Sequence, residues 1–397
     1  MNFQLQNIKK YSLLKNTLIS FGLLSCILAA QAQNQLPNFK NEFGKIKGEV
    51  PGCAIGIIHD GQLIHEQYYG MANIQYQVLN DEKTQFNMGS VSKHITAAVL
   101  FRLEKDGLIN KNDKLIKYYP QGPKWFEKIT LSHLIQHKSG LPDYVNDPTM
   151  APKFFLSIAQ QPEITNALIV GLPVTHEQIV QAVLQELNNL SSLAYEPGIH
   201  TIYSNTGYLF LGDIVNVATG KNLRHWANHY IFEPNKLENI TVHNNSSAEL
   251  KWAATGYMRL PSTKGYSSLV ETLVSFGDTG VITSLQDFTK WMTVLSQAND
   301  SDSVWNGFLI EYSESKAKNS LMGLYDNGLS INTYKNNTIY SHNGQSLDSM
   351  TSNFWIAPEK KIGYVQMCNT IVSKVPSKYK IFKYVDEYLK LQEKVSL

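Results

Sequence analysis

The stretch Gly89-Ser90-Val91-Ser92-Lys93 lies where a short polar segment runs into a strongly apolar pattern with helical periodicity. A serine at a helix start has its hydroxyl near unpaired backbone N–H groups and the positive end of the helix dipole. Residues three apart share a helix face, so Lys93 is expected beside Ser90. A lysine there can take the proton that a serine loses on becoming a nucleophile. The stretch therefore predicts a nucleophilic serine followed by a helix.

The Ser-x-x-Lys pattern has little value alone, because it also begins at Ser12, Ser313, Ser315 and Ser377. Only Ser90 follows a glycine and leads directly into an apolar helix. A structural explanation remains open at this point, since Ser90 could simply cap that helix.

The N-terminus has the pattern of a secretory signal peptide over residues 1–32. Three lysines precede an apolar run that ends in Ala30-Gln31-Ala32, a small-x-small cleavage site. The run is too short for an ordinary membrane span, and no later segment has the pattern of one. We expect cleavage between Ala32 and Gln33 and a periplasmic or secreted protein. Lipoprotein processing at Cys26 is a weaker alternative, because apolar residues follow this cysteine.

Charge and cysteine content limit the possible partners. Without the three leader lysines, the formal charge falls from +2 to −1. A nearly neutral chain without basic blocks argues against nucleic acid as a partner. Cys53 and Cys368 both lie in apolar, strand-like runs. We interpret them as small buried side chains, although a disulfide is possible in an oxidising compartment.

The order of predicted elements is strands, helices, strands and a final helix. Residues 53–72 have the pattern of a hairpin with a turn at Asp60-Gly61. Strands return at residues 328–334, 338–342, 351–357 and 362–368, and an amphipathic helix is expected over 377–393. Helices are predicted over residues 91–105, 130–137, 176–188, 205–219, 223–232 and 284–296. This order predicts an α/β (α+β) fold: one antiparallel sheet built from both chain ends (about 33–87 and 300–397), with a helical lobe (about 88–299) inserted between them.

Two further groups of polar residues stand at the ends of predicted elements. Tyr203 can relay a proton, and Asn205 can hydrogen-bond a substrate amide. His342 ends a predicted strand, where Gly344 would let a substrate approach the backbone and Gln345 could offer its N–H to an oxyanion. Each group could also be ordinary capping or a strand end.

His133 and His137 have the spacing of zinc ligands on a helix. The glutamate of a His-Glu-x-x-His motif is absent, because Leu134 follows His133, and no cluster of acids offers a third ligand. We therefore predict no metal site, and nothing in the sequence requires a cofactor.

The flanks of these groups, in this order, resemble the class C β-lactamase and D-Ala-D-Ala carboxypeptidase family of serine hydrolases, also called the β-lactamase-related family. The matching segments are residues 51–54, 86–97, 137–144, 196–198, 203–208, 254–257 and 342–344. The resemblance covers nearly the whole of residues 33–397 and implies a single β-lactamase/transpeptidase-like catalytic domain.

The resemblance also implies roles for the site residues. Ser90 would be the acylated nucleophile and Lys93 its partner, either as a neutral base or as a cation that supports Tyr203. Tyr203 would pass the proton to the leaving group and later activate water. Asn205 would hold the substrate, and the N–H groups of Ser90 and Gln345 would bind the oxyanion.

One departure bears on the substrate. His342 stands where class C β-lactamases carry a lysine that binds the substrate carboxylate, and an unperturbed histidine is mostly neutral. We therefore expect an amide or ester hydrolase that acts on a peptide or small molecule. A D-amino-acid peptide is favoured, with peptidoglycan among the candidates, as for a D,D-carboxypeptidase or D-aminopeptidase. An esterase, a weak class C-like β-lactamase and a non-catalytic penicillin- or peptidoglycan-binding protein are the alternatives.

Overall fold

The computed structural model describes residues 49–243, 250–261, 265–315, 323–372 and 375–395. The predicted signal peptide and Cys26 lie outside these residues. In the described part of the chain, no helix is both long and apolar enough to cross a membrane. Residues 46–375 form one compact unit, and the C-terminal helix α13 (Lys378–Val395) belongs to another. This helix confirms the one predicted over 377–393 and is described by itself.

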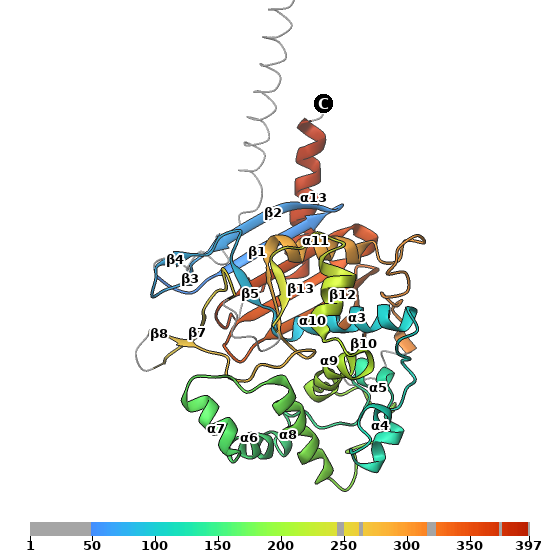
Figure 1. Cartoon of the computed structure of the whole chain (residues 1–397). Helices are drawn as coiled ribbons and strands as arrows, with labels where there is room; N and C mark the ends of the chain where they lie inside the picture. Colours follow the sequence, from blue (N-terminus) through green and yellow to red (C-terminus); the bar gives the residue numbers. More distant parts are fainter. Residues whose placement is uncertain (1–48, 244–249, 262–264, 316–322, 373–374, 396–397) are drawn as a thin grey trace, which may run out of the picture. The chain divides into compact units, whose positions relative to one another are not determined.

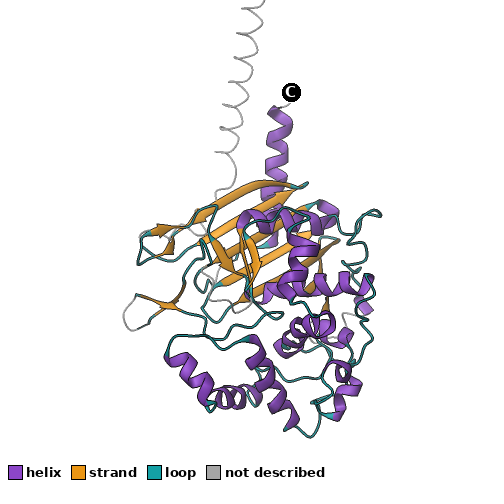
Figure 2. Ribbon diagram, in the orientation of Figure 1, coloured by secondary structure: helices purple, strands orange, loops and turns teal. Residues whose placement is uncertain are grey.

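A seven-stranded antiparallel sheet is the framework of the larger unit (Figures 1 and 2). Its strand order is β10-β11-β12-β13-β14-β1-β2, so strands from the two ends of this unit meet at the β14–β1 pair. In Figure 1 the blue strands β1 and β2 lie beside the orange and red strands of the C-terminal part. The strands are β1 (Cys53–His59), β2 (Gln62–Tyr69), β10 (Leu324–Asp326), β11 (Leu329–Tyr334), β12 (Asn337–Gln345), β13 (Thr351–Ala357) and β14 (Ile362–Cys368).

The predicted hairpin at residues 53–72 is confirmed as β1 and β2. Asp60 and Gly61 both have positive φ, 47° and 76°, as a tight two-residue hairpin turn requires. The apolar run of β1 is buried along nearly its full length, which explains why its sequence shows no alternation.

The helix α11 (Leu285–Ser296) packs against β1 and β14. Ser284 caps its N-terminus by accepting a hydrogen bond from the Asp287 N–H (3.3 Å). The close approach depends on two glycines of the sheet. A Cβ on Gly56 would lie 3.1 Å from Leu285, and one on Gly363 would lie 2.7 Å from Met292.

Most helices lie in the middle of the chain, as expected, and the predicted helices over 176–188 and 205–219 match α8 and α9. The helices of this part are α3 (Lys93–Lys105), α4 (Leu115–Tyr118), α5 (Leu131–Ile135), α6 (Met150–Ala159), α7 (Pro162–Ile169), α8 (His176–Asn188), α9 (Asn205–Thr219) and α10 (Leu223–Ala227), with 3₁₀ turns η1 (Gly89–Ser92) and η2 (Lys124–Lys128) and a π turn η3 (Asn228–Phe232). A further 3₁₀ turn, η4 (Pro358–Lys360), joins β13 to β14.

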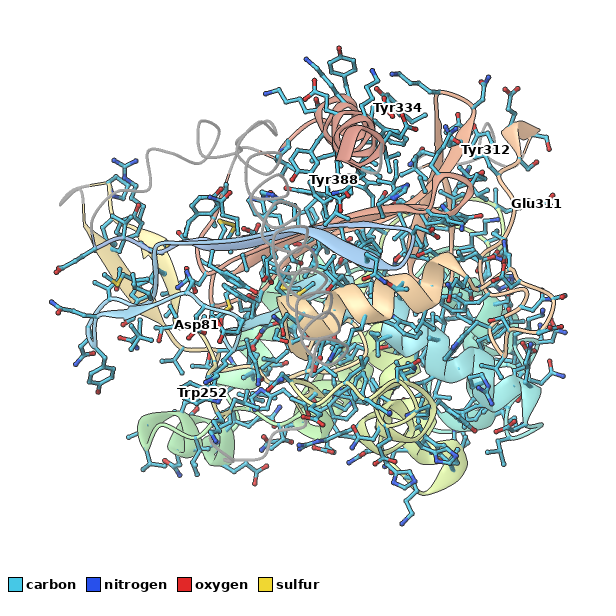
Figure 3. The ribbon with its side chains drawn as sticks, turned by 90° about the horizontal axis from the view of Figure 1, so that it is seen from above. Asp81, Trp252, Glu311, Tyr312, Tyr334 and Tyr388 are labelled. Atoms are coloured by element: carbon cyan, nitrogen blue, oxygen red, sulfur yellow. A yellow bond between two sulfur atoms is a disulfide. The ribbon has the colours of Figure 1, made fainter. Side chains whose placement is uncertain are left out.

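The middle segment also contains short strands that were not predicted. They are β5 (Gln85–Asn87), β6 (Ile240–Val242) and β9 (Val281–Ser284) in one small sheet, the pair β7 (Gly256–Arg259) and β8 (Tyr266–Leu269), and, before β5, the pair β3 (Met71–Asn73) and β4 (Val78–Leu79). Strands of two to four residues are too short to show a period in the sequence. Trp252, labelled in Figure 3, follows β6 and lies beside β5, because its carbonyl accepts the Gln85 N–H (2.9 Å).

Cys53 and Cys368 are buried, as expected, and the disulfide that the sequence left open is formed. The two residues face each other across the β1–β14 pair and form a disulfide with a sequence separation of 315 residues. Their burial was predicted correctly, since both are almost fully inaccessible. The pairing could not be predicted, because it depends on which strands become neighbours.

Replacing both Cys53 and Cys368 by alanine is expected to lower the free energy of unfolding by about 2–4 kcal/mol, because the disulfide closes a very long loop in the unfolded chain. Thermal or urea unfolding of the variant and of wild-type protein measures this difference. Reduced wild-type protein should show the same loss, and an unchanged midpoint after complete reduction would contradict the expectation.

Candidate active site

Ser90 lies in the 3₁₀ turn η1, between β5 and α3. The predicted helix thus begins as a tighter turn, since Gly89 has a positive φ of 50° and its N–H donates to the Asn87 side chain (3.0 Å). The His94 side chain holds this turn in place. Its Nδ1 contacts the Val91 carbonyl, and its Nε2 accepts the Trp291 indole N–H (2.9 Å). Ser90 itself is partly exposed at the start of this rigid segment.

Lys93 is fully buried beside Ser90, as the sequence predicted. Its Nζ lies 3.2 Å from Ser90 Oγ, 2.7 Å from Asn205 Oδ1 and 2.7 Å from the Asp278 carbonyl. Burial lowers the pKa of Lys93 to about 8, against the opposing effect of the negative charges on Asp278 and Asp143. About a tenth of the lysine is therefore uncharged at pH 7, and about half at pH 8. A neutral amine has two hydrogens for Asn205 and Asp278 and one lone pair for the Ser90 hydroxyl.

Asn205 begins α9, and Asp143 fixes its orientation. The Asp143 carboxylate accepts hydrogen bonds from the backbone N–H of Asn205 (3.2 Å) and from its side-chain amide (3.0 Å). The same carboxylate accepts the backbone N–H groups of Val145 and Asn146, so it is itself held by its loop. With the amide nitrogen turned to Asp143, the amide oxygen of Asn205 must face Lys93.

Asp278, from the segment that precedes β9, lies beside Lys93 and lines the pocket at Ser90. Its main-chain carbonyl accepts from Lys93, and its Oδ2 accepts the Tyr144 hydroxyl (2.8 Å). Its side chain is 3% exposed, and Oδ1 has no hydrogen-bond partner among the described residues. Burial raises the pKa of Asp278, while Lys93 and the hydroxyls of Tyr144 and Ser275 oppose this rise.

Tyr203 lies against Lys93, whose Nζ is 4.9 Å from the centre of the tyrosine ring. The Tyr203 hydroxyl is buried and has no hydrogen bond to the described residues. Burial raises the pKa of Tyr203 above its usual value, and the nearby Ser90 hydroxyl offsets only part of this rise. The phenol therefore stays protonated at neutral pH.

His342 is buried, and both its ring nitrogens contact protein groups. Nδ1 lies 2.6 Å from the Asn343 carbonyl and must carry the hydrogen, so Nε2 accepts the Tyr325 hydroxyl (3.0 Å). Burial lowers the pKa of His342 to about 3, with the charge of Lys93 acting in the same direction. This histidine is therefore neutral, as expected, and supplies no positive charge. It also does not line the pocket at Ser90.

Gly344 and Gln345 lie where β12 passes the turn that carries Ser90. The structural reason for Gly344 differs from the one predicted, because a Cβ would lie 2.0 Å from the Met88 carbonyl oxygen. The glycine thus allows β12 to approach η1 rather than a substrate. The Ser346 N–H donates to the carbonyl of Met350, which precedes β13. Successive N–H groups along an antiparallel strand point in opposite directions, so the N–H of Gln345 points away from β13.

A pocket of about 300 Å³ opens at Ser90. Four of the predicted site residues line it: Ser90, Tyr203, Asn205 and Gln345. Its other lining residues are Tyr144, Val145, Asn146, Glu271, Ser275, Asp278, Thr279, Ser346 and Leu347. The structure thus gathers segments that are far apart in sequence around one accessible serine, with Lys93 behind it.

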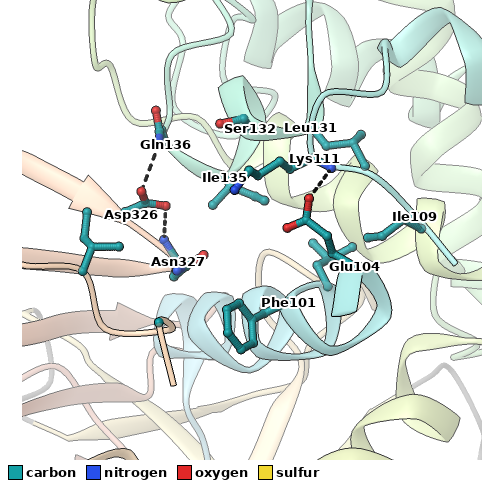
Figure 4. A pocket seen from close by; sticks show the side chains of 13 residues that line it. Phe101, Glu104, Ile109, Lys111, Leu131, Ser132, Ile135, Gln136, Asp326 and Asn327 are labelled. Atoms are coloured by element: carbon teal, nitrogen blue, oxygen red, sulfur yellow. Dashed lines mark hydrogen bonds between the residues drawn. The ribbon is translucent and has the colours of Figure 1, made fainter. Parts of the chain in front are cut away.

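A second pocket, shown in Figure 4, lies beside α3 and α5 and does not include Ser90. Several of its polar side chains are hydrogen-bonded to one another or to the backbone. The Gln136 amide donates to Asp326 (3.0 Å), and the Glu104 carboxylate accepts the Lys111 N–H (3.0 Å). Its described lining residues include none of Ser90, Lys93 and Tyr203.

The spacing of His133 and His137 does not produce a metal site. The predicted helix over 130–137 is too long, since α5 ends at Ile135 and His137 has a positive φ of 54°. His133 Nδ1 accepts the Thr130 N–H, and His137 Nδ1 accepts the Ser204 N–H. The described residues contain no group of three or more side chains that could hold a metal ion.

Three acidic residues of the site were missed in the sequence. Asp143 was noted only as part of a matching segment, and Asp278 and Glu271 were not noted. A sequence signal exists for Asp278, which lies in Gly277-Asp278-Thr279-Gly280 after the mostly apolar residues 273–276. Glu271 offers no such signal.

Comparison with known proteins places the chain in a family. The sequence profile of the Beta-lactamase family matches residues 30–381, and the chain belongs to this family of serine hydrolases. Among curated proteins, it is 23% identical over 337 residues to Protein flp of Staphylococcus aureus (strain MW2), covering 83% of this chain but 62% of that protein. It is 27% identical over 200 residues to Penicillin-binding protein 4* of Bacillus subtilis (strain 168), covering 50% of this chain and 40% of that protein.

Solved structures share the fold. An octameric penicillin-binding protein homologue from Pyrococcus abyssi matches with a TM-score of 0.69 and 21% identity, over 91% of this chain and 77% of that one. The D-amino acid amidase of Ochrobactrum anthropi SV3 matches with a TM-score of 0.62 and 20% identity, over 92% and 99% of the two chains. These similarities confirm the predicted β-lactamase/transpeptidase-like fold.

The rate at which a fluorophosphonate labels the protein is expected to rise with pH, with a midpoint near 8, because the Lys93 amine accepts the serine proton only after losing its own. Labelling rates between pH 5.5 and 9.5 measure this profile, corrected for probe hydrolysis. A rate independent of pH over this range would contradict the role of Lys93 as the base.

Asp143→Asn is expected to lower the high-pH labelling rate by about tenfold, since a charged hydrogen bond that orients Asn205 is lost. The same change should move the midpoint of the pH profile to lower pH, because the Asp143 charge raises the pKa of Lys93.

Asp147→Asn is the matched control, since Asp147 also accepts loop N–H groups, those of Thr149 and Met150. A midpoint that does not move in Asp143→Asn, in a protein that still folds, would refute the coupling.

Proposed function

We propose that the protein is a serine hydrolase that forms an acyl-enzyme on Ser90 and cleaves an amide or ester bond, with D-amino-acid amides or peptides as the substrate class. The observation that carries the proposal is the buried Lys93 amine, 3.2 Å from a pocket-facing serine hydroxyl. An amine with a pKa near 8 is suited to accept a proton at neutral pH.

Acylation follows from this geometry. Ser90 Oγ forms a bond to the substrate carbonyl carbon while its proton moves to Lys93 Nζ. The negative oxygen that results faces the backbone N–H groups of Ser90 and Gln345. Collapse of this intermediate breaks the bond to the leaving group, which takes a proton from the Tyr203 hydroxyl, and Lys93 returns a proton to Tyr203. Water releases the acyl group by the reverse sequence.

The sequence left two roles open for Lys93, and the pKa directions favour one of them. A cationic lysine that supports a tyrosinate would need a lowered pKa at Tyr203. Burial instead raises the pKa of Tyr203 and lowers that of Lys93. Lys93 therefore acts as the neutral base, and Tyr203 as a protonated relay.

The substrate class rests on His342 and on the family. A neutral His342 that faces Tyr325 provides no cation for the carboxylate of a β-lactam. Similarity to a D-amino acid amidase supports an acyclic amide of a D-amino acid. Curated relatives extend well beyond this chain, so their whole activities are not assumed for it.

We propose the periplasm or the cell exterior as the location. The signal-like N-terminus supports export, and the Cys53–Cys368 disulfide is typical of an oxidising compartment. Fractionation of cells that express the full chain, with cleavage near Ala32 checked by N-terminal sequencing, tests this location.

Wild-type protein is expected to become covalently labelled by a fluorophosphonate, and Ser90→Ala protein to remain unlabelled. Mass spectrometry of the labelled peptide would place the adduct on Ser90. Turnover of D-alanine p-nitroanilide, a short-chain nitrophenyl ester and nitrocefin then ranks substrates, with little or no nitrocefin turnover expected.

Ser92→Ala is a suitable control, because Ser92 is buried and its hydroxyl accepts the Val281 N–H rather than facing the pocket. Equal labelling of wild-type and Ser90→Ala protein would refute the nucleophile. Rapid nitrocefin turnover would show that the argument from His342 is wrong.

A further inference from the structure

The pocket at Ser90 has acidic side chains in its wall. Glu271 and Asp278 both line it, and its lining among the described residues contains no lysine or arginine. Lys93, which is buried beside the pocket, already has three hydrogen-bond partners. Histidines near the site do not add charge, since burial lowers the pKa of both His137 and His342.

Glu271 is held close to the nucleophile. Its Oε2 accepts the Asn87 side-chain amide (3.0 Å), and the Asn87 oxygen accepts the Gly89 N–H of the turn that carries Ser90. Its other oxygen, Oε1, is buried and has no hydrogen-bond partner among the described residues. Asp278 Oδ1 is a second buried oxygen without a partner in the described part of the chain.

The carboxyl groups around the pocket repel one another. Burial raises the pKa of Glu271 to about 8, and the charges of Asp348 and Asp278 add to this rise. Asp348 is itself 8% exposed. Two other carboxyl groups, those of Asp143 and Asp278, act on Lys93 itself. A positive group in the pocket would relieve this imbalance and would pair an oxygen that now has no partner.

A substrate carboxylate would meet the opposite situation. It would find no lysine or arginine among the described lining residues to bind it. Its negative charge would also disfavour the ionised forms of Glu271 and Asp278 close by. The charge of the pocket therefore distinguishes two substrate types that the proposed function leaves open. It disfavours peptides with a free C-terminal carboxylate near the scissile bond. It favours amides or peptides with a free amino group beside the scissile carbonyl.

We propose that the Glu271 side of the pocket is a binding site for the ammonium group of the substrate, so that the enzyme acts on amino-acid amides or on the N-terminal residue of peptides. The inference rests on the proposed function for its choice of substrate. Glu271 is the principal ligand, and Asp278 strengthens the negative potential around it. Because Glu271 Oε1 is shielded from water in the unliganded site, the ammonium group reaches it through a small rotation of the side chain.

Binding to Ser90→Ala protein tests the site without turnover. D-alaninamide and propionamide differ by the amino group alone. We expect D-alaninamide to bind about tenfold more tightly in calorimetry at pH 7, as a charged hydrogen bond provides. Glu271 should also release most of one proton on binding, because it is largely protonated in the free protein. Calorimetry in buffers of different ionisation enthalpy counts this proton.

The double variant Ser90→Ala/Glu271→Gln should bind the two amides within about twofold of each other and release no proton. The matched control is Ser90→Ala/Glu163→Gln, since Glu163 is an exposed residue of α7 outside the pocket lining. It should retain the tenfold preference.

Equal binding of the two amides to Ser90→Ala protein would overturn the ammonium site. So would a preference that survives Glu271→Gln, or tighter binding of propionate than of propionamide, which would place a protonated Glu271 as a donor to a carboxylate. Failure of the proposed function is seen separately, as the absence of fluorophosphonate labelling in wild-type protein.

Discussion

The buried amine of Lys93 is the group on which the site depends. Its nitrogen makes three hydrogen bonds, to the Ser90 hydroxyl, the Asn205 amide oxygen and the Asp278 carbonyl. These partners come from η1, from α9 and from the segment before β9. Because the loss of any partner would leave a polar group unsatisfied in the interior, the amine that we propose as the base also fixes three distant segments against one another.

Two opposing effects set the pKa of the Lys93 amine. Burial disfavours its charged form, and the carboxylates of Asp143 and Asp278 favour it. Their balance leaves the pKa of Lys93 within reach of neutral pH. The carboxylates also do separate structural work, since Asp143 orients Asn205 and Asp278 accepts the Tyr144 hydroxyl. Asp143 and Asp278 therefore serve both the lysine and the local structure, whereas Glu271 is not among the charges that act on Lys93.

What the sequence could predict depended on length and on local pattern. Helices α8 and α9 agree with their predicted bounds because their periodic patterns are long, and strands β13 and β14 do so because the turn at Pro358-Glu359 separates them. Ser90, Lys93, Tyr203 and Asn205 were grouped correctly because each stands at the start of a recognisable element. The contacts of Asp143 and Glu271 span 62 and 184 residues, and the disulfide needs the register of β1 against β14. Such pairings are created by the fold and leave no local trace.

The β14–β1 pair, locked by Cys53 and Cys368, has a consequence for the order of events during synthesis. The first strand of the sheet can pair early with β2, but its other neighbour, β14, carries Cys368, which is made 315 residues after Cys53. The backbone of Gln345, which lies against Gly89, also comes from this late part of the chain. Contacts so distant in sequence form slowly and only when both ends are present. A growing chain therefore carries Ser90 in an unfinished pocket, which is complete only once the last strands have been added.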